Sequence, residues 1–156
     1  MTLTPIGTIY SPFTEGTNTP IQPRFGRGVR GHIILKEPYV EGLADLEGFE
    51  RVWLLFHLDR AKPHRMKVVP YRDTQLRGLF STRAPSRPNP IGLSCVRVVG
   101  VDGPRVDIED VDMLDGTPLI DIKPYVPRFD AYPDAGAGWL DTRVEEREKA
   151  DDRFHK

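Results

Sequence analysis

The chain of 156 residues has a formal net charge of −1 and one cysteine, with 38 % hydrophobic and 29 % charged residues. This length and composition are typical of one globular domain with its own core, and no apolar run approaches the roughly eighteen residues of a membrane span. A single cysteine excludes an internal disulfide and a multi-thiolate metal site, and residues 1–12 lack the pattern of a secretory signal, so we expect a cytoplasmic protein.

Short apolar runs rich in β-branched residues recur along the chain and predict a mainly β domain. Fifteen prolines and fourteen glycines leave little room for long helices. In chain order, the predicted strands are residues 6–11, 29–35, 51–58, 66–70, 94–103, 105–113 and 118–126. Many short strands separated by turn signals favour a barrel or a sandwich.

Three features of these strands lead to more specific predictions. The nearly continuous apolar run of residues 51–58 predicts a strand buried on both faces. Asp102 and Gly103 stand between two β-branched runs, which indicates a hairpin turn. Cys95 lies within an apolar run and is expected to be a small core residue.

Helical structure is expected only in short pieces. A helical turn is expected within residues 39–50, where Leu43 and Leu46 can share one face. The polar residues 141–156 are interpreted as a tail that forms a short helix or frays, so that residues 1–140 make up the folded domain.

Charge is distributed unevenly along the chain. Residues 60–87 contain eight Lys or Arg and one acidic residue, whereas residues 101–156 contain fifteen Asp or Glu and eight Lys or Arg. A basic segment is most often a solvated surface, but it can also bind phosphates. The residues alone leave both interpretations open.

The segment 78–94, GLFSTRAPSRPNPIGLS, is unusually rigid for a connection. Its three prolines fix φ and favour extended backbone at Arg87 and Asn89, which each precede a proline. Such a loop can present Arg83 and Arg87 to an anion at little entropic cost, and Gly92 permits a tight turn into the next strand. The alternative is a proline-stiffened surface crossover.

A second polar segment follows at residues 112–130. Asp115, Gly116, Thr117 and Pro118 form a turn by residue type, since Asp accepts from backbone amides and Gly supplies a positive φ. This turn is either an ordinary hairpin turn or a site that offers a carboxylate and backbone groups to a ribose or an amine.

The usual catalytic motifs are absent. His57 ends an apolar run, where histidine is more often structural than catalytic, and its spacing from His32 and His64 is not that of a metal site. The glycines around Arg27 do not form a dinucleotide fingerprint, and no P-loop or hydrolase serine motif occurs. We therefore expect no metal.

Residues 80–94, FSTRAPSRPNPIGLS, and residues 114–130, LDGTPLIDIKPYVPRFD, together resemble the two motifs of the TsaA-like, or TrmO-type, methyltransferase family. The N-terminal segment PIGTIYSPF, residues 5–13, also resembles the start of this family's sequences. The resemblance implies a single small β-barrel with few short helices that binds S-adenosylmethionine without a Rossmann sheet. It also implies a homodimer that transfers a methyl group to N6 of threonylcarbamoyladenosine beside the tRNA anticodon.

Carried over motif by motif, the resemblance places the cofactor against segments 20–22, 57–58 and 115–118 and against Arg83 and Leu93. Ile21 stands where the family more usually has arginine. The cofactor-binding residues that it implies are Pro20, Ile21, Gln22, His57, Leu58, Arg83, Leu93, Asp115, Gly116, Thr117 and Pro118.

The acceptor nitrogen is a poor nucleophile until its proton leaves, so a base is expected. Asp115, His57 or Asp121 can serve, and the substrate's own carboxylate is another route. Arg87 and Asn89 are assigned to the substrate side of the pocket. The basic segment, with Arg65 and Lys67, is assigned to the phosphates of the anticodon stem-loop.

Two further hypotheses remain open. The same fold can methylate a small-molecule acceptor, or the chain can be a non-catalytic module that binds an adenosyl ligand or RNA. A strongly salt-dependent affinity for anticodon stem-loops favours the tRNA enzyme.

Overall fold

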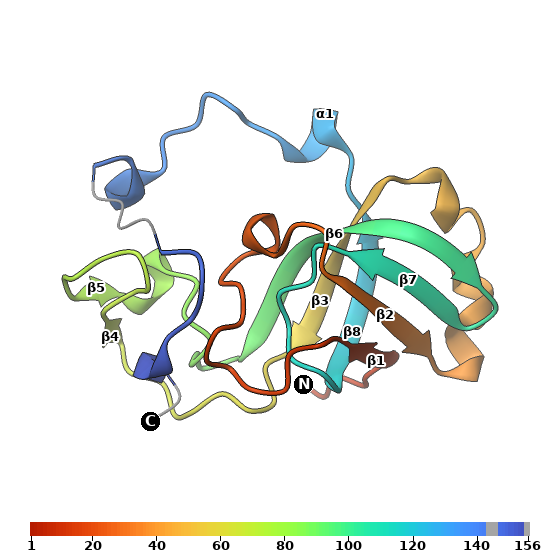
Figure 1. The fold of residues 1–156 in the computed structure, drawn as a ribbon, viewed down its shortest axis with the longest axis horizontal. Helices are drawn as coiled ribbons and strands as arrows, with labels where there is room; N and C mark the ends of the chain where they lie inside the picture. The colour runs from red at the N-terminus through yellow and green to blue at the C-terminus, as the bar shows by residue number, and fades with distance from the viewer. Residues whose placement is uncertain (143–146, 155–156) are drawn as a thin grey trace.

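The computed structural model describes residues 1–142 and 147–154, and its central feature is a closed barrel of six antiparallel strands (Figure 1). Around the barrel the strands follow the order β1-β2-β7-β6-β3-β8, and β8 pairs with β1 to close it. The predicted mainly β barrel is therefore confirmed. The strands are β1 (Gly7–Tyr10), β2 (Arg30–Leu35), β3 (Arg51–His57), β6 (Ile91–Asp102), β7 (Arg105–Glu109) and β8 (Thr117–Pro124).

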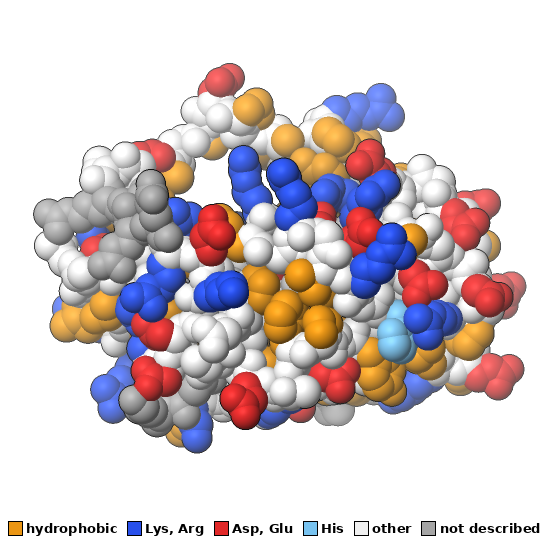
Figure 2. Space-filling view, in the orientation of Figure 1, with side chains coloured by type: hydrophobic (Ala, Val, Ile, Leu, Met, Phe, Trp, Pro, Cys, Tyr) orange, Lys and Arg blue, Asp and Glu red, His pale blue; other side chains and the backbone are white. Residues whose placement is uncertain are grey.

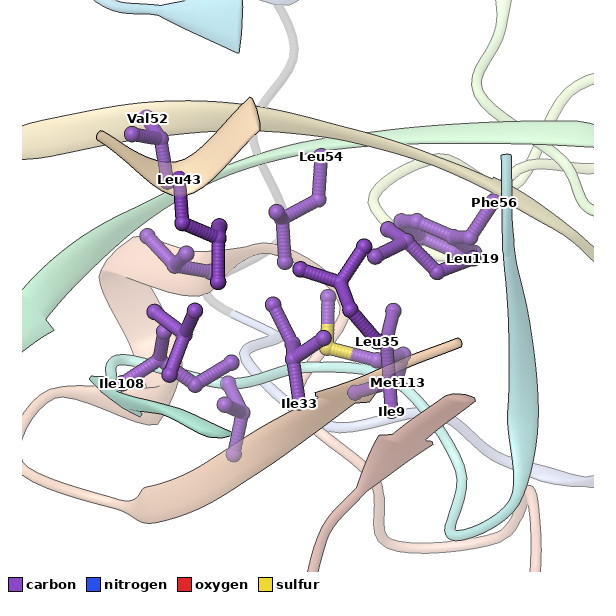
Figure 3. Packing of buried hydrophobic residues seen from close by; sticks show 13 residues of the cluster. Ile9, Ile33, Leu35, Leu43, Val52, Leu54, Phe56, Ile108, Met113 and Leu119 are labelled. Atoms are coloured by element: carbon purple, nitrogen blue, oxygen red, sulfur yellow. The ribbon is translucent and has the colours of Figure 1, made fainter. Parts of the chain in front are cut away.

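The barrel interior is filled by branched aliphatic side chains (Figure 3). In β3, Val52, Leu54 and Phe56 point into this core, whereas Trp53 and Leu55 are half-buried on the outer face. The prediction that this strand is buried on both faces is wrong, because a barrel strand presents alternate residues to the inside and the outside. The alternation of inward and outward residues was not evident in the sequence, because the outward residues Trp53 and Leu55 are also apolar.

The neighbouring strand β6 corrects two more predictions. It begins at Ile91, three residues before the predicted start, and Ser94 and Val96 point inward. Cys95, between them, is only half-buried and pairs with Trp53 across the strands, so its assignment to the core is wrong. The hairpin between β6 and β7 is confirmed, and its turn lies at Gly103, where φ is +54°.

Beside the barrel lies a smaller lobe built on two short strands, β4 (Lys67–Val68) and β5 (Arg77–Gly78) (Figure 1). Residues 66–70 were predicted as a strand, but β5 was not predicted. The 3-10 helix η4 (Leu79–Ser81) follows β5. The lobe has its own small core, made by Val68, Leu79, Ala84 and Phe154 with Tyr71 packed against them.

The remaining helices are short. The helical turn expected within residues 39–50 is present as two 3-10 helices, η2 (Glu37–Leu43) and η3 (Leu46–Gly48). The others are η1 (Pro23–Gly26), α1 (Pro127–Asp130), η5 (Gly138–Asp141) and η6 (Asp152–Phe154). Across residues 1–142 and 147–154, no helix has the length and apolar character to span a bilayer.

The C-terminal segment runs from the barrel to the lobe and packs there (Figure 1). Backbone amides of Asn18 and Ile21 donate to the carbonyls of Ala150 and Glu148 at 2.9 and 3.0 Å, and Ala150 donates to Thr19 at 2.8 Å. Ala150 and Phe154 are buried. Although this segment is polar, its described part, residues 147–154, is thus held by backbone pairing and by two apolar side chains.

Candidate functional site

A cavity of about 380 Å³ opens at the end of the barrel where β3 ends and β6 begins. Its lining is drawn from some of the residues within segments 16–22, 56–61, 82–87, 91–94 and 112–117, together with Tyr71 and the C-terminal Ala150 and Phe154. This volume lies in the range of small-molecule sites, which are mostly apolar with a few polar groups. The barrel, the lobe and the C-terminal segment therefore build one site together.

Close packing of Phe56 against Gly92 shapes the barrel side of this cavity. A Cβ built on Gly92 would lie 2.1 Å from the Phe56 ring, far inside van der Waals contact. Gly92 is therefore needed for close approach, because only a residue without a side chain lets the ring lie across β6. Both residues line the cavity.

The proline-rich loop is braced from within by Arg87. Its Nη1 donates to the carbonyl oxygens of Thr82 and Ala84 at 3.0 and 3.3 Å, and its guanidinium lies 5.7 Å from the Phe80 ring centre. The Thr82 hydroxyl donates to the Leu79 carbonyl at 2.8 Å. Arg87 lines the cavity, but these contacts use part of its hydrogen-bonding capacity to hold the loop.

Arg83 joins the proline-rich loop to the N-terminal segment. Its Nη1 donates to Oε1 of Gln22, and both residues line the cavity. The Arg83 side chain is exposed, so its remaining donors are accessible to a ligand. Two segments more than sixty residues apart in the sequence thus meet on one cavity wall.

The polar turn after residue 114 is tied to the start of the chain. Oδ1 of Asp115 accepts from the Ser11 backbone amide at 3.0 Å, and the Asp115 carbonyl accepts from the Arg60 guanidinium. The Thr117 hydroxyl donates to the Leu114 carbonyl at 2.6 Å, and Gly116 has φ of +79°. The Asp115 carboxylate therefore has a structural role in this turn.

Asp112, three residues earlier, is the carboxylate that lies deepest in the site. It lines the cavity, and the Ser94 hydroxyl donates to its Oδ1 at 2.7 Å. Burial raises the pKa of Asp112 from 3.8 to about 7, although the Ser94 hydrogen bond and the Arg83 charge both favour the ionised form. This residue can therefore exchange a proton near neutral pH.

The structure brings together about half of the site residues predicted from the sequence. Those that line the cavity are Pro20, Ile21, Gln22, Leu58, Arg83, Arg87, Leu93 and Thr117. Those outside its lining are His57, Asn89, Arg65, Lys67, Asp115, Gly116 and Pro118. His57 and Asn89 are exposed, and Asp121 forms an ion pair with Lys123 at 2.9 Å.

Several residues of the lining were not predicted. They include Thr19, Phe56, Arg60, Tyr71, Ser94, Asp112, Met113, Ala150 and Phe154. Asp112 and Ser94 stand at the edges of the two polar motifs, and this position is the sequence feature that could have indicated them as lining residues. Among the described residues no group of three or more His, Cys, Asp or Glu is arranged to hold a metal ion.

The chain resembles known proteins over most of its length. A probable S-adenosyl-L-methionine-binding protein of Pyrococcus abyssi is 47 % identical over 148 residues, covering 95 % of this chain and 80 % of that protein. The tRNA (adenine(37)-N6)-methyltransferase of Escherichia coli is 37 % identical over 144 residues, covering 86 % of this chain and 61 % of that protein.

Solved structures agree with these relatives. The crystal structure of TrmO from Pseudomonas aeruginosa matches with a TM-score of 0.79 at 41 % identity, covering 93 % of this chain and 65 % of that chain. This chain therefore spans less than two thirds of the E. coli and P. aeruginosa proteins. The family model of the tRNA-methyltransferase O N-terminal domain matches residues 8–131. The chain belongs to this TrmO-type family.

Proposed function

We propose that this protein is an S-adenosylmethionine-dependent methyltransferase that methylates N6 of threonylcarbamoyladenosine next to the anticodon of tRNA. The observation that carries the proposal is the cavity itself, because segments 20–22, 82–87, 91–94 and 112–117 converge on it. The names of the E. coli and P. abyssi relatives support the reaction and the cofactor.

The cavity suits the cofactor's chemistry. S-adenosylmethionine combines a flat adenine and a ribose with a sulfonium and an amino-acid end. Arg83, which is accessible at the wall, would hold the carboxylate of that end, since a guanidinium binds a carboxylate through two parallel hydrogen bonds. Phe56, Leu58 and Leu93 offer apolar surface for the adenosyl part. The cofactor supplies a methyl group on a cationic sulfur, and in-line alignment of the acceptor then accounts for much of the rate.

The tRNA would bind across a basic surface near the cavity. Figure 2 shows several Lys and Arg side chains on this face of the molecule, with Asp and Glu side chains among them. Within residues 60–87, Arg60, Arg77 and Arg87 are engaged in contacts within the protein. The exposed basic side chains that we assign to phosphate contacts are Arg24, Arg27, Lys62, Arg65 and Lys67.

The proposal includes a homodimer and a cytoplasmic location, where tRNA is modified. Ile91 and Leu93, at the cavity, are 38 % and 52 % exposed, and Phe80, at the proline-rich loop, is 69 % exposed. Large apolar side chains grouped at a site mark surfaces that bind partners. A molar mass of twice the chain mass in light scattering supports the dimer, and the monomer mass at micromolar concentration contradicts it.

The function is tested by methyl transfer from labelled S-adenosylmethionine. The substrate is tRNA carrying threonylcarbamoyladenosine, and the control is the same tRNA without that modification. Label in the modified tRNA alone is the expected result. Cofactor binding without label in either tRNA contradicts the proposal and favours a small-molecule acceptor or a non-catalytic module.

A further inference from the structure

We propose that Asp112 is the catalytic base that removes the proton from the acceptor nitrogen during methyl transfer, an assignment that rests on the proposed function. The carboxylates put forward from the sequence, Asp115 and Asp121, are not positioned for this role. Asp115 lies outside the cavity lining and accepts from the Ser11 amide, and Asp121 forms an ion pair with Lys123.

The carboxyl group of Asp112 has the geometry that a base requires. It lines the same cavity as the segments assigned to the cofactor. Ser94 donates to Oδ1 at 2.7 Å and so orients the group from inside the barrel wall. A carboxylate has about four acceptor positions, so the bonds from Ser94 and from the backbone amide of Asp112 itself leave positions for a substrate N–H.

The second carboxylate on the cavity lining is Asp59, and its surroundings differ. Asp59 is exposed and forms an ion pair with the neighbouring Arg60 at 3.5 Å. Asp112 is desolvated, which raises its pKa to about 7. A base of that strength accepts a proton efficiently, and a substantial fraction of it is ionised near neutral pH.

The other ionisable groups around the cavity set the electrostatics of Asp112. Arg83 stabilises the ionised form, and burial raises the pKa of Tyr71, which keeps that phenol neutral. The charged or ionisable residues that line the cavity with Asp112 are Asp59, Arg60, Tyr71, Arg83 and Arg87. A bound sulfonium would add a further positive charge and move the pKa of Asp112 downward.

The step balances with these groups alone. The N6 lone pair forms the new bond to the methyl carbon, and the carbon–sulfur bond breaks with both electrons moving to sulfur. The sulfonium becomes a neutral thioether. The proton of N6 passes to the Asp112 carboxylate, so the product nitrogen is neutral and the carboxyl later returns the proton to solvent.

The test is single-turnover methyl transfer with saturating S-adenosylmethionine and tRNA carrying threonylcarbamoyladenosine. The rate is measured across roughly pH 5.5–9, the range around neutrality where this base titrates. The wild-type rate is expected to rise with pH and level off. Asp112→Asn, which keeps the side chain's shape, is expected to bind cofactor within about 3-fold but to transfer about 100-fold or more slowly, without the rise. Ser94→Ala should move the inflection to higher pH, because it removes a hydrogen bond that favours the charged carboxylate.

Asp107→Asn serves as the matched control. Asp107 lies on β7, is 42 % exposed, and pairs with Arg105 at 2.8 Å. It should keep both the rate and the pH profile, and a thermal melt of each variant confirms folding.

The outcomes separate the two proposals. If Asp112→Asn transfers at the wild-type rate, Asp112 is not the base. If it loses cofactor affinity in parallel with its rate, the carboxylate binds the cofactor's positive end and the assignment is likewise overturned. If the wild type binds cofactor but methylates no threonylcarbamoyladenosine, the proposed function fails, and the base assignment fails with it.

Discussion

The barrel and the cavity-bearing half of the molecule are held together by different forces. The barrel has continuous strand pairing around a core in which Ile9, Val52, Leu54 and Ile108 are fully buried. The lobe has two strands of two residues each and a core of four buried side chains. Its loops are stabilised by prolines, by Arg87 and by the C-terminal segment. The barrel core therefore supplies most of the stability, and the lobe and its loops complete the site at the barrel end.

Substitutions in the barrel core should lower stability most. Leu54→Ala removes a fully buried side chain, which should lower the free energy of unfolding by about 3 kcal/mol and the melting temperature by roughly 8 °C. Calorimetry below the transition should find cofactor affinity nearly unchanged. A large loss of affinity in folded protein would show that barrel and site are not separable.

A substitution at Gly92, where the barrel meets the cavity, should lower both the stability of the fold and the affinity for the cofactor. Gly92→Ala places a Cβ 2.1 Å from the Phe56 ring, so the ring must move into the cavity. We expect a loss of about 2 kcal/mol in stability together with weaker cofactor binding. Val99→Ala on the same strand provides a matched control, because this side chain is 42 % exposed and lies outside the cavity lining, so its loss should change stability and cofactor affinity little. Equal melting temperatures for Gly92→Ala and the wild type would contradict this packing.

The site should also reduce stability in a pH-dependent manner. Because the folded-state pKa of Asp112 is raised from 3.8 to about 7, the folded protein binds more protons than the unfolded chain between these values, and stability falls as pH rises through that window. The cost is fully present above about pH 7 and amounts to a few kcal/mol, since each pKa unit corresponds to about 1.4 kcal/mol. Asp112→Asn should therefore be more stable than the wild type at pH 8 and show little difference at pH 4. Denaturation that finds the variant less stable at pH 8 would mean that Asp112 is not desolvated.

The same contrast between barrel and site explains what sequence reasoning could predict. Barrel strands such as β2 and β8 follow the period of their own residues, so their positions and the mainly β class were predictable. The choice of a barrel over a sandwich came from the family resemblance. The cavity depends on contacts between distant segments, and these leave little local signal. Asp112 is desolvated because Ser94 and the barrel end surround it, and Phe154 reaches the lobe core from a polar tail. The motifs thus located the site, whereas the places of Asp112, Ser94 and Phe154 in its lining could be seen only in the structure.

Substitution of exposed basic residues of the lobe should change the affinity for tRNA and neither the stability nor the affinity for the cofactor. Arg65→Glu with Lys67→Glu should lower tRNA affinity about 10-fold at low salt and reduce the salt dependence, because fewer phosphates are neutralised. Melting temperature and cofactor affinity should stay within error. The pair Arg97→Glu and Arg105→Glu, on β6 and β7, tests whether any charge reversal has the same effect. Unchanged tRNA affinity in the lobe variant would place the RNA surface elsewhere.

The most direct test of the cofactor site is a titration of S-adenosylmethionine into the wild type and Arg83→Ala by calorimetry, with Arg105→Ala as the control. Arg83 is exposed on the cavity wall and donates to Gln22, so its removal should leave the melting temperature almost unchanged. We expect the dissociation constant to rise about 10-fold or more in Arg83→Ala, because a charged hydrogen-bond donor to the cofactor is lost, and to stay constant in the control. Wild-type affinity in Arg83→Ala would contradict the placement of the cofactor in this cavity.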